Sequence, residues 1–106
     1  MWEEKLVFYD EIVAKANFER KGKTMPYTSA NGHMFSLFNK AGEIGIRLSK
    51  ESGEKFMEKY NTGRFKSHGA FMKGYVLIPE SLYDDIDLIV ETLKEGHAYV
   101  LTLEPK

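Results

Sequence analysis

Residues 33–48, "HMFSLFNKAGEIGIRL", contain the clearest structural signal in this 106-residue chain. Two largely apolar runs, 33–38 and 43–48, flank the residues "NKAG", in which Gly42 can take the positive φ of a tight hairpin loop. In the second run every other residue is apolar, which is the period of a strand with one buried face: Ile44, Ile46 and Leu48. The stretch predicts an antiparallel β-hairpin.

A helix is predicted on each side of this hairpin. Residues 2–19 place one set of apolar side chains on a single helical face: Trp2, Leu6, Tyr9, Ile12, Val13 and Ala16. Ser49 is a suitable N-cap for a short second helix over about residues 50–60, because its hydroxyl can accept from a first-turn N–H. Gly63 is available for the left-handed position after that helix.

The second half of the chain predicts further strands and a third helix. A short extended piece near Phe65 and a turn around Gly69 precede a strand from Phe71 to Ile78. Pro79 suits the first turn of a helix that runs to about Glu95, with apolar residues at helical spacing: Leu82, Ile86, Ile89, Val90 and Leu93. Gly96 is expected to end this helix. Residues 98–103, "AYVLTL", fit either a short strand or a last helical turn.

The predicted order is of the α-β-β-α-β-β-α type, within a single domain over residues 1–106. Strands joined by tight turns favour an antiparallel sheet, and three helices suffice to cover one side of it, which predicts a two-layer α+β fold. Strand alternation prevents one apolar set (Met34, Phe38, Met72 and Val76) from facing the same core as another (Phe35, Leu37, Phe71 and Tyr75). We therefore expect a homodimer contact or another protein partner to cover part of the second sheet face.

Composition limits the class of protein. The chain is 42% hydrophobic and 29% charged, as is typical of a soluble globular domain, and it has no cysteine. It contains no run of about 18 apolar residues, and its first residues are acidic where a secretory signal is basic. These features predict a cytoplasmic protein that does not enter a membrane. Charge is segregated, with net values of −3, +7 and −5 over residues 1–19, 20–78 and 79–106.

Hydrogen-bonding side chains are concentrated in "MPYTSANGHMF", residues 25–35: Tyr27, Thr28, Ser29, Asn31 and His33. One interpretation is a tied turn, because Ser and Asn side chains bond nearby backbone and Asn31-Gly32 readily takes positive φ. The other is a ligand-binding or partner-binding surface made by these five residues. The sequence leaves both open.

Signals for catalysis are weak. No nucleophile elbow accompanies Ser29 and His33, and the three histidines (His33, His68 and His97) lack the short spacing of metal ligands. The glycines of "GEIGIRLSKESG" do not have the order of a phosphate-binding loop. We expect no catalytic residue, no metal and no cofactor, although an enzyme or small-ligand protein that uses the 27–33 loop stays an alternative.

Nucleic-acid binding is a second alternative. Basic residues of the middle segment are interleaved with aromatic ones, and Arg64, Lys66 and Lys73 are the candidate phosphate contacts on a basic, aromatic sheet face. No predicted helix carries the basic stripe of a groove reader, and the acidic helices would repel phosphate. Lysines that keep an exposed sheet edge in solution would give the same pattern.

Three strings carry a family resemblance: "MPYTSANGHMFSLF", "IRLSKESGEKFMEKYNT" and "FMKGYVLIPESL". They resemble the TfoX N-terminal domain family, also called TfoX/Sxy-like, and more closely a single-domain branch with a "MPYTS-x-NGHMFS" opening. The resemblance covers roughly Lys23 to Val100 and implies an α/β sandwich with a five-stranded antiparallel sheet. It also implies a regulatory or protein-interaction domain, since the family is named for a competence regulator. It supplies no catalytic residues. We therefore expect a non-enzymatic regulatory or protein-interaction domain.

Overall fold

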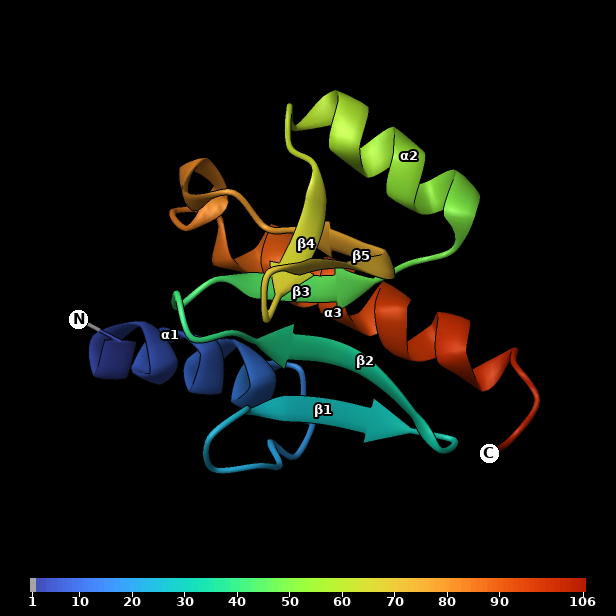
Figure 1. Ribbon diagram of the computed structural model, residues 1–106, viewed down its shortest axis with the longest axis horizontal. Helices are drawn as coiled ribbons and strands as arrows, with labels where there is room; N and C mark the ends of the chain where they lie inside the picture. The colour runs from blue at the N-terminus through green and yellow to red at the C-terminus, as the bar shows by residue number, and fades with distance from the viewer. Residues whose placement is uncertain (1) are drawn as a thin grey trace.

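Five strands form one antiparallel sheet in the computed structural model, which describes residues 2–106 (Figure 1). The strands are β1 (Tyr27–Ala30), β2 (His33–Phe38), β3 (Ile44–Arg47), β4 (Arg64–Ser67) and β5 (Ala70–Leu77), and their order in the sheet is β1-β2-β3-β5-β4. The helices are α1 (Trp2–Lys15), α2 (Lys50–Lys59) and α3 (Ile86–Leu101), with a short 3-10 turn, η1 (Glu80–Leu82), before α3. The predicted α+β class is confirmed. So is the β2–β3 hairpin, in which Gly42 has a φ of +80°.

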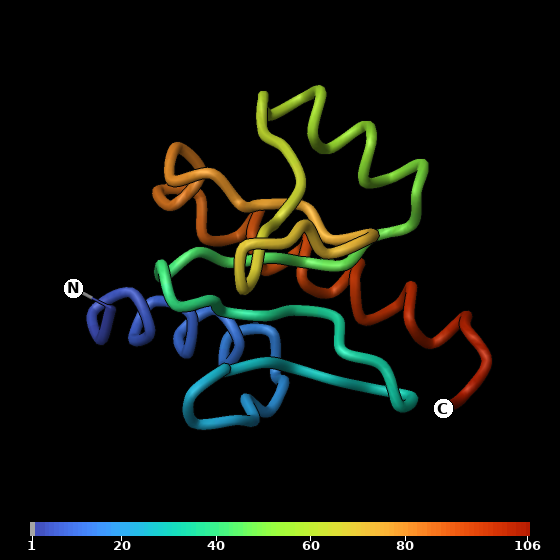
Figure 2. The backbone as a smooth tube through the Cα atoms, in the orientation of Figure 1, coloured from blue at the N-terminus to red at the C-terminus, as the bar shows by residue number. Residues whose placement is uncertain are grey.

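The main core lies between one face of the sheet and the helices. Tyr9, Ile12 and Val13 of α1 meet Ile89 and Leu93 of α3 in this core, and all five side chains are almost fully buried. Phe56 of α2 joins the same cluster, beside β5. Figure 2 shows that the chain after α3 ends close to the turn between β1 and β2.

A bulge in β2 explains how residues of both alternations share this core. Thr28 pairs with Ser36 but the next residue, Ser29, pairs with Met34, so Phe35 has no partner in β1. An extra residue of this kind places two successive side chains on nearly the same side of a strand. Phe35 and Phe38 consequently lie in the same core, which strict alternation does not allow.

The β4–β5 hairpin folds over the opposite face of the sheet (Figure 1). Phe65 of β4 is fully buried there with Leu37 and Tyr75, and its ring lies directly over Gly45 of β3. A Cβ atom at Gly45 would collide with that ring. The second face, part of which we expected a partner to cover, is thus partly covered by the chain itself.

An irregularity in β5 permits this fold-over. Arg64 pairs with Val76, whereas Lys66 pairs with Phe71, so the register shifts between these two pairs. Gly74, with a φ of +84°, lies in the shifted part of β5. The segment after Gly74 pairs with β3, and the segment before it swings away with β4.

Two helices end differently from the predictions. Helix α1 stops at Lys15 rather than residue 19, because Asn17 takes a left-handed φ of 63° and the N–H of Phe18 bonds back to the carbonyl of Val13 at 3.0 Å. The predicted cap of α2 is confirmed, since Ser49 Oγ accepts from the N–H of Ser52 at 3.2 Å. The left-handed residue after α2 is Asn61 and not Gly63.

The prediction that Gly96 ends the third helix is wrong. Helix α3 continues to Leu101, which also decides that most of residues 98–103 are helical. Gly96 is buried against the sheet, where a Cβ atom would lie 2.8 Å from the carbonyl oxygen of Arg47 and 3.0 Å from Ile46 Cγ2. Glycine here permits close approach of helix and sheet. The helix starts at Ile86 because Asp85 provides its N-cap, after the 3-10 turn that follows Pro79.

We expect Gly45→Ala to lower the free energy of unfolding by about 1–3 kcal/mol, the usual cost of overfilling a core. The new methyl group would displace the ring of Phe65. Urea unfolding measures the change. Gly63→Ala is the matched control, since nothing lies within 4 Å of its added Cβ atom. It should change stability by less than about 0.5 kcal/mol. Equal effects of the two substitutions would contradict the placement of Phe65.

Candidate functional site

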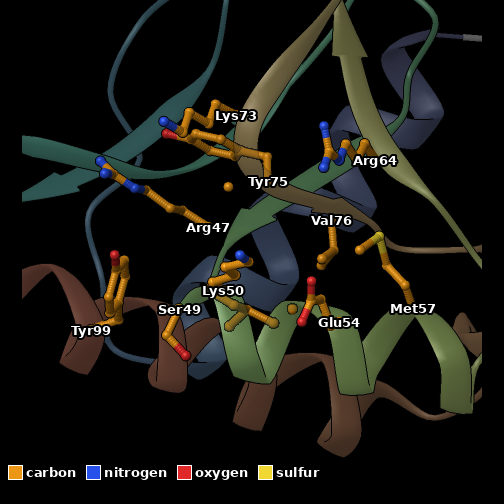
Figure 3. A pocket seen from close by; sticks show the side chains of 13 residues that line it. Arg47, Ser49, Lys50, Glu54, Met57, Arg64, Lys73, Tyr75, Val76 and Tyr99 are labelled. Atoms are coloured by element: carbon orange, nitrogen blue, oxygen red, sulfur yellow. The ribbon is translucent and has the colours of Figure 1, made fainter.

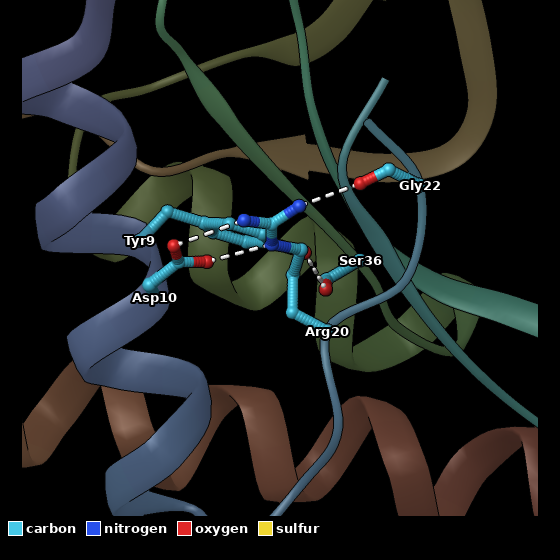
Figure 4. A network of polar contacts seen from close by, with 5 residues as sticks. All are labelled: Tyr9, Asp10, Arg20, Gly22 and Ser36. Carbon is cyan, nitrogen blue, oxygen red and sulfur yellow. Dashed lines mark hydrogen bonds and ion pairs between the residues drawn. The ribbon is translucent and has the colours of Figure 1, made fainter. Parts of the chain in front are cut away.

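The polar stretch 25–35 contributes the first strand of the sheet. Thr28 in β1 is almost fully buried, and its Oγ1 lies 2.6 Å from Ser36 Oγ. Ser36 Oγ in turn lies 2.6 Å from the hydroxyl of Tyr9 (Figure 4). Burial raises the pKa of Tyr9 above its ordinary range. These three hydroxyl groups form hydrogen bonds with one another between α1 and the sheet. The hydroxyl of Thr28 is therefore used in a contact inside the protein.

Asn31 connects the β1–β2 turn to the end of α3. Its backbone has a left-handed φ of 58°, which Asn tolerates better than most residues. Its side-chain amide donates to the carbonyl oxygens of Val100 and Leu103, at 3.0 and 2.9 Å. Nearby, His33 Nε2 lies 2.8 Å from the carbonyl oxygen of Glu104. Both side chains hold the chain after α3 against the turn.

The loop before β1 is held by Arg20. Its guanidinium donates to both carboxylate oxygens of Asp10, at 2.8 and 3.2 Å, and to the carbonyl oxygen of Gly22 at 2.6 Å (Figure 4). The hydrogen bond with Asp10 raises the pKa of Arg20 further, so the side chain stays charged. A two-way bridge between Lys21 and Tyr27 then leads the chain into β1.

The five predicted surface residues therefore lie in different surroundings. Thr28 is in the core, Asn31 and His33 bind the segment after α3, and Ser29 makes an exposed contact with Lys21 Nζ at 3.4 Å. Tyr27 lies on the opposite sheet face. These contacts favour the tied-turn interpretation, while ligand binding by the set stays a prediction.

An apolar hollow of about 430 Å³ lies on the second sheet face, between the β1–β2 strands and the β4–β5 hairpin. Apolar side chains make most of its lining: Met25, Tyr27, Met34, Leu37, Phe71 and Met72. Leu37 is buried, but the side chain of Phe71 is 63% exposed. We call it the apolar hollow. It is a part of the second sheet face that the β4–β5 hairpin leaves uncovered.

The three predicted phosphate contacts do not form one surface. Arg64 and Lys73 line a groove between α2 and β5 (Figure 3). Lys66 lies elsewhere, with its Nζ 5.0 Å from the ring centre of Phe71. The groove also contains Arg47, one of the basic residues of the middle segment, together with Lys50 and Tyr99. Sequence reasoning did not single out Lys50 and Tyr99, because no motif joins positions so far apart in the chain.

Residues 2–106 contain no group of three His, Asp or Glu side chains that could hold a metal ion. No helix within these residues combines the length and apolar character needed to cross a membrane.

We expect Asn31→Ala to lower the free energy of unfolding by about 2 kcal/mol, because it removes two hydrogen bonds and places Ala at positive φ. Ser29→Ala, in the same stretch, is the control and should cost less than about 0.5 kcal/mol. His33→Ala should also fold normally. Chemical denaturation of the three variants measures these differences. A stable Asn31→Ala protein would show that the turn does not depend on α3.

Stability should fall as the pH rises above about 10, the ordinary pKa of tyrosine. Burial raises the pKa of Tyr9 beyond that value and the pKa of Tyr75 to about 12, so both rings are neutral when folded but ionise earlier when unfolded. The two neutral tyrosines contribute their full stabilisation below about pH 10. This stabilisation is lost as the pH rises through their higher folded-state pKa values. Tyr9→Phe should cost about 1 kcal/mol near neutral pH and make the alkaline decline shallower. Denaturant unfolding at about pH 8 and pH 10.5 tests this, and an unchanged slope would contradict it.

A scan against models of known protein families and a search of curated proteins find no match to this chain. The resemblance to the TfoX N-terminal domain family therefore depends on the three sequence strings quoted above.

Proposed function

We propose that this protein is a small, non-enzymatic interaction domain of the TfoX N-terminal type, which binds an acidic protein partner at the apolar hollow. The observation that carries the proposal is the side chain of Phe71, which is 63% exposed beside Met25, Met34 and Met72. Aromatic residues and Met are enriched in the centres of protein interfaces.

The hollow combines a firm base with adaptable walls. Leu37 of its lining is buried in one cluster with Phe65 and Tyr75, and the hydroxyl of Tyr75 donates to the carbonyl oxygen of Met34 at 3.0 Å. The three methionines above them have flexible, polarisable side chains that adjust to the shape of a partner. Such a surface suits an apolar side chain inserted by another protein.

Charge indicates the kind of partner. Residues 20–42 and 61–78 hold seven basic residues and no acidic one. Arg20 is paired with Asp10, and Arg64 and Lys73 line the groove beside α2, which leaves four lysines: Lys21, Lys23, Lys40 and Lys66. Two copies of the chain that met through this face would bring these like charges together. A partner segment with acidic residues around an apolar side chain would instead be attracted to it. The charge favours a different protein over a face-to-face homodimer.

The test compares two exposed apolar residues. Partners captured from a lysate by the wild-type protein should be identified, purified and titrated against it by calorimetry. Phe71→Ser should weaken binding at least tenfold, as removal of an interface anchor does. Val7→Ser is the matched control, because Val7 is 69% exposed on α1 and should leave affinity unchanged.

Both variants should keep the wild-type melting temperature, since both positions are exposed. Binding that survives Phe71→Ser, or that is lost equally with Val7→Ser, would refute the proposed surface.

The nucleic-acid alternative is separated by an NMR titration with single-stranded and duplex oligonucleotides at low and moderate salt. Salt-sensitive shifts confined to Lys66–Met72 would assign the apolar hollow to base stacking instead. Light scattering of the protein alone tests the homodimer, and a monomer is expected.

A further inference from the structure

A second hollow, of about 680 Å³, lies between α2 and β5 and shares no lining residue with the apolar hollow. Figure 3 shows side chains from the sheet on one side of it and side chains from the start of α2 on the other. Its volume lies within the range of small-molecule sites. We call it the basic groove.

Four basic side chains line the groove, and each comes from a different element. Arg47 is the last residue of β3, Lys50 the first of α2, Arg64 the first of β4, and Lys73 lies in β5. Glu54 is the single acidic residue of the lining, so the groove carries a net charge of +3. The fold has brought together residues spread over 27 positions of the sequence.

Within residues 2–106, none of these four cations forms an ion pair with a carboxylate. Ion pairs in the described part of the chain, residues 2–106, join Arg20 to Asp10, Lys55 to Glu51 and Lys94 to Glu91, and none involves the four groove residues. Arg47 is partly buried, with its guanidinium carbon 5.7 Å from the ring centre of Tyr99. Like charges held around one hollow repel one another, and an anion between them removes that repulsion.

The arrangement suits phosphate in particular. Guanidinium groups bind phosphate oxygens through two parallel hydrogen bonds, and ammonium groups contribute point charges. Two linked phosphate groups carry about three to four negative charges near neutral pH, which balances the net charge of the groove. The first turn of α2, which begins at Lys50, adds a favourable dipole but is secondary to the side chains.

We propose that the basic groove binds a ligand with at least two linked phosphates, through Arg47, Lys50, Arg64 and Lys73. Pyrophosphate is the minimal probe, and ATP tests whether a nucleoside adds affinity. The phosphates of a nucleic acid have the same chemistry, so a short oligothymidylate forms a third arm. Calorimetry at low and moderate salt gives the affinities.

The decisive comparison is between two double variants with equal charge changes. Arg64→Gln with Lys73→Gln should weaken pyrophosphate binding at least tenfold. Lys40→Gln with Lys66→Gln removes the same charge, partly from the same hairpin, but lies outside the groove and should change affinity less than twofold. Glu54→Gln should tighten binding, because it removes the one negative charge of the lining.

Each outcome decides the proposal. Tighter binding of ATP or pyrophosphate than of the oligonucleotide identifies a small phosphate ligand. Preference for the oligonucleotide, with the same sensitivity to the Arg64/Lys73 variant, identifies nucleic acid as the source of the phosphates. No binding of any probe, or equal weakening by the two double variants, overturns the site. Neither failure bears on Phe71, whose variant tests the protein partner separately.

Discussion

The contact between Gly45 and Phe65 determines how the β4–β5 hairpin covers the second face of the sheet. Because β3 has no side chain at Gly45, the ring of Phe65 can lie directly on the sheet, and β4 can cross over it. The crossing is fixed at one further point, where the side-chain amide of Asn39 donates to the carbonyl oxygen of Lys66 at 2.7 Å. The folded-over hairpin then has two flanks. One closes the apolar hollow against β1 and β2, and the other closes the basic groove against α2.

Elements with local signals were predictable from the sequence. The β2–β3 hairpin, the Ser49 cap and the strand before Pro79 depend on residues that are neighbours in the chain. What was missed depends on distant contacts. In the sequence Gly96 has the pattern of a helix breaker, but in the fold it allows α3 to approach the carbonyl oxygen of Arg47, 49 residues earlier. The bulge at Phe35 likewise arises from pairing with β1. It places Phe35 and Phe38 in the same core, which the alternation of side chains along a strand does not predict.

The candidate sites were less predictable than the fold. The residue types in 25–35 are the same for a tied turn and for a ligand surface, and the partners of Asn31 lie 69 and 72 residues away. For the groove, the excess of positive charge in the middle of the chain was visible, and it included Arg47, Arg64 and Lys73. Which of these cations share a hollow depends on the fold-over, and that depends on a glycine whose function no local pattern reveals.

The link from Asn31 to the end of α3 has a consequence for folding kinetics. Closing a loop of about 70 residues costs several times RT in chain entropy, so this clamp cannot form before other contacts have shortened the path between its ends. The β2–β3 hairpin requires only a short closure and can form first. Until α3 docks, the β1–β2 turn lacks its hydrogen bonds to Val100, Leu103 and Glu104. By this entropy argument, the end of α3 fixes the β1–β2 turn late in folding.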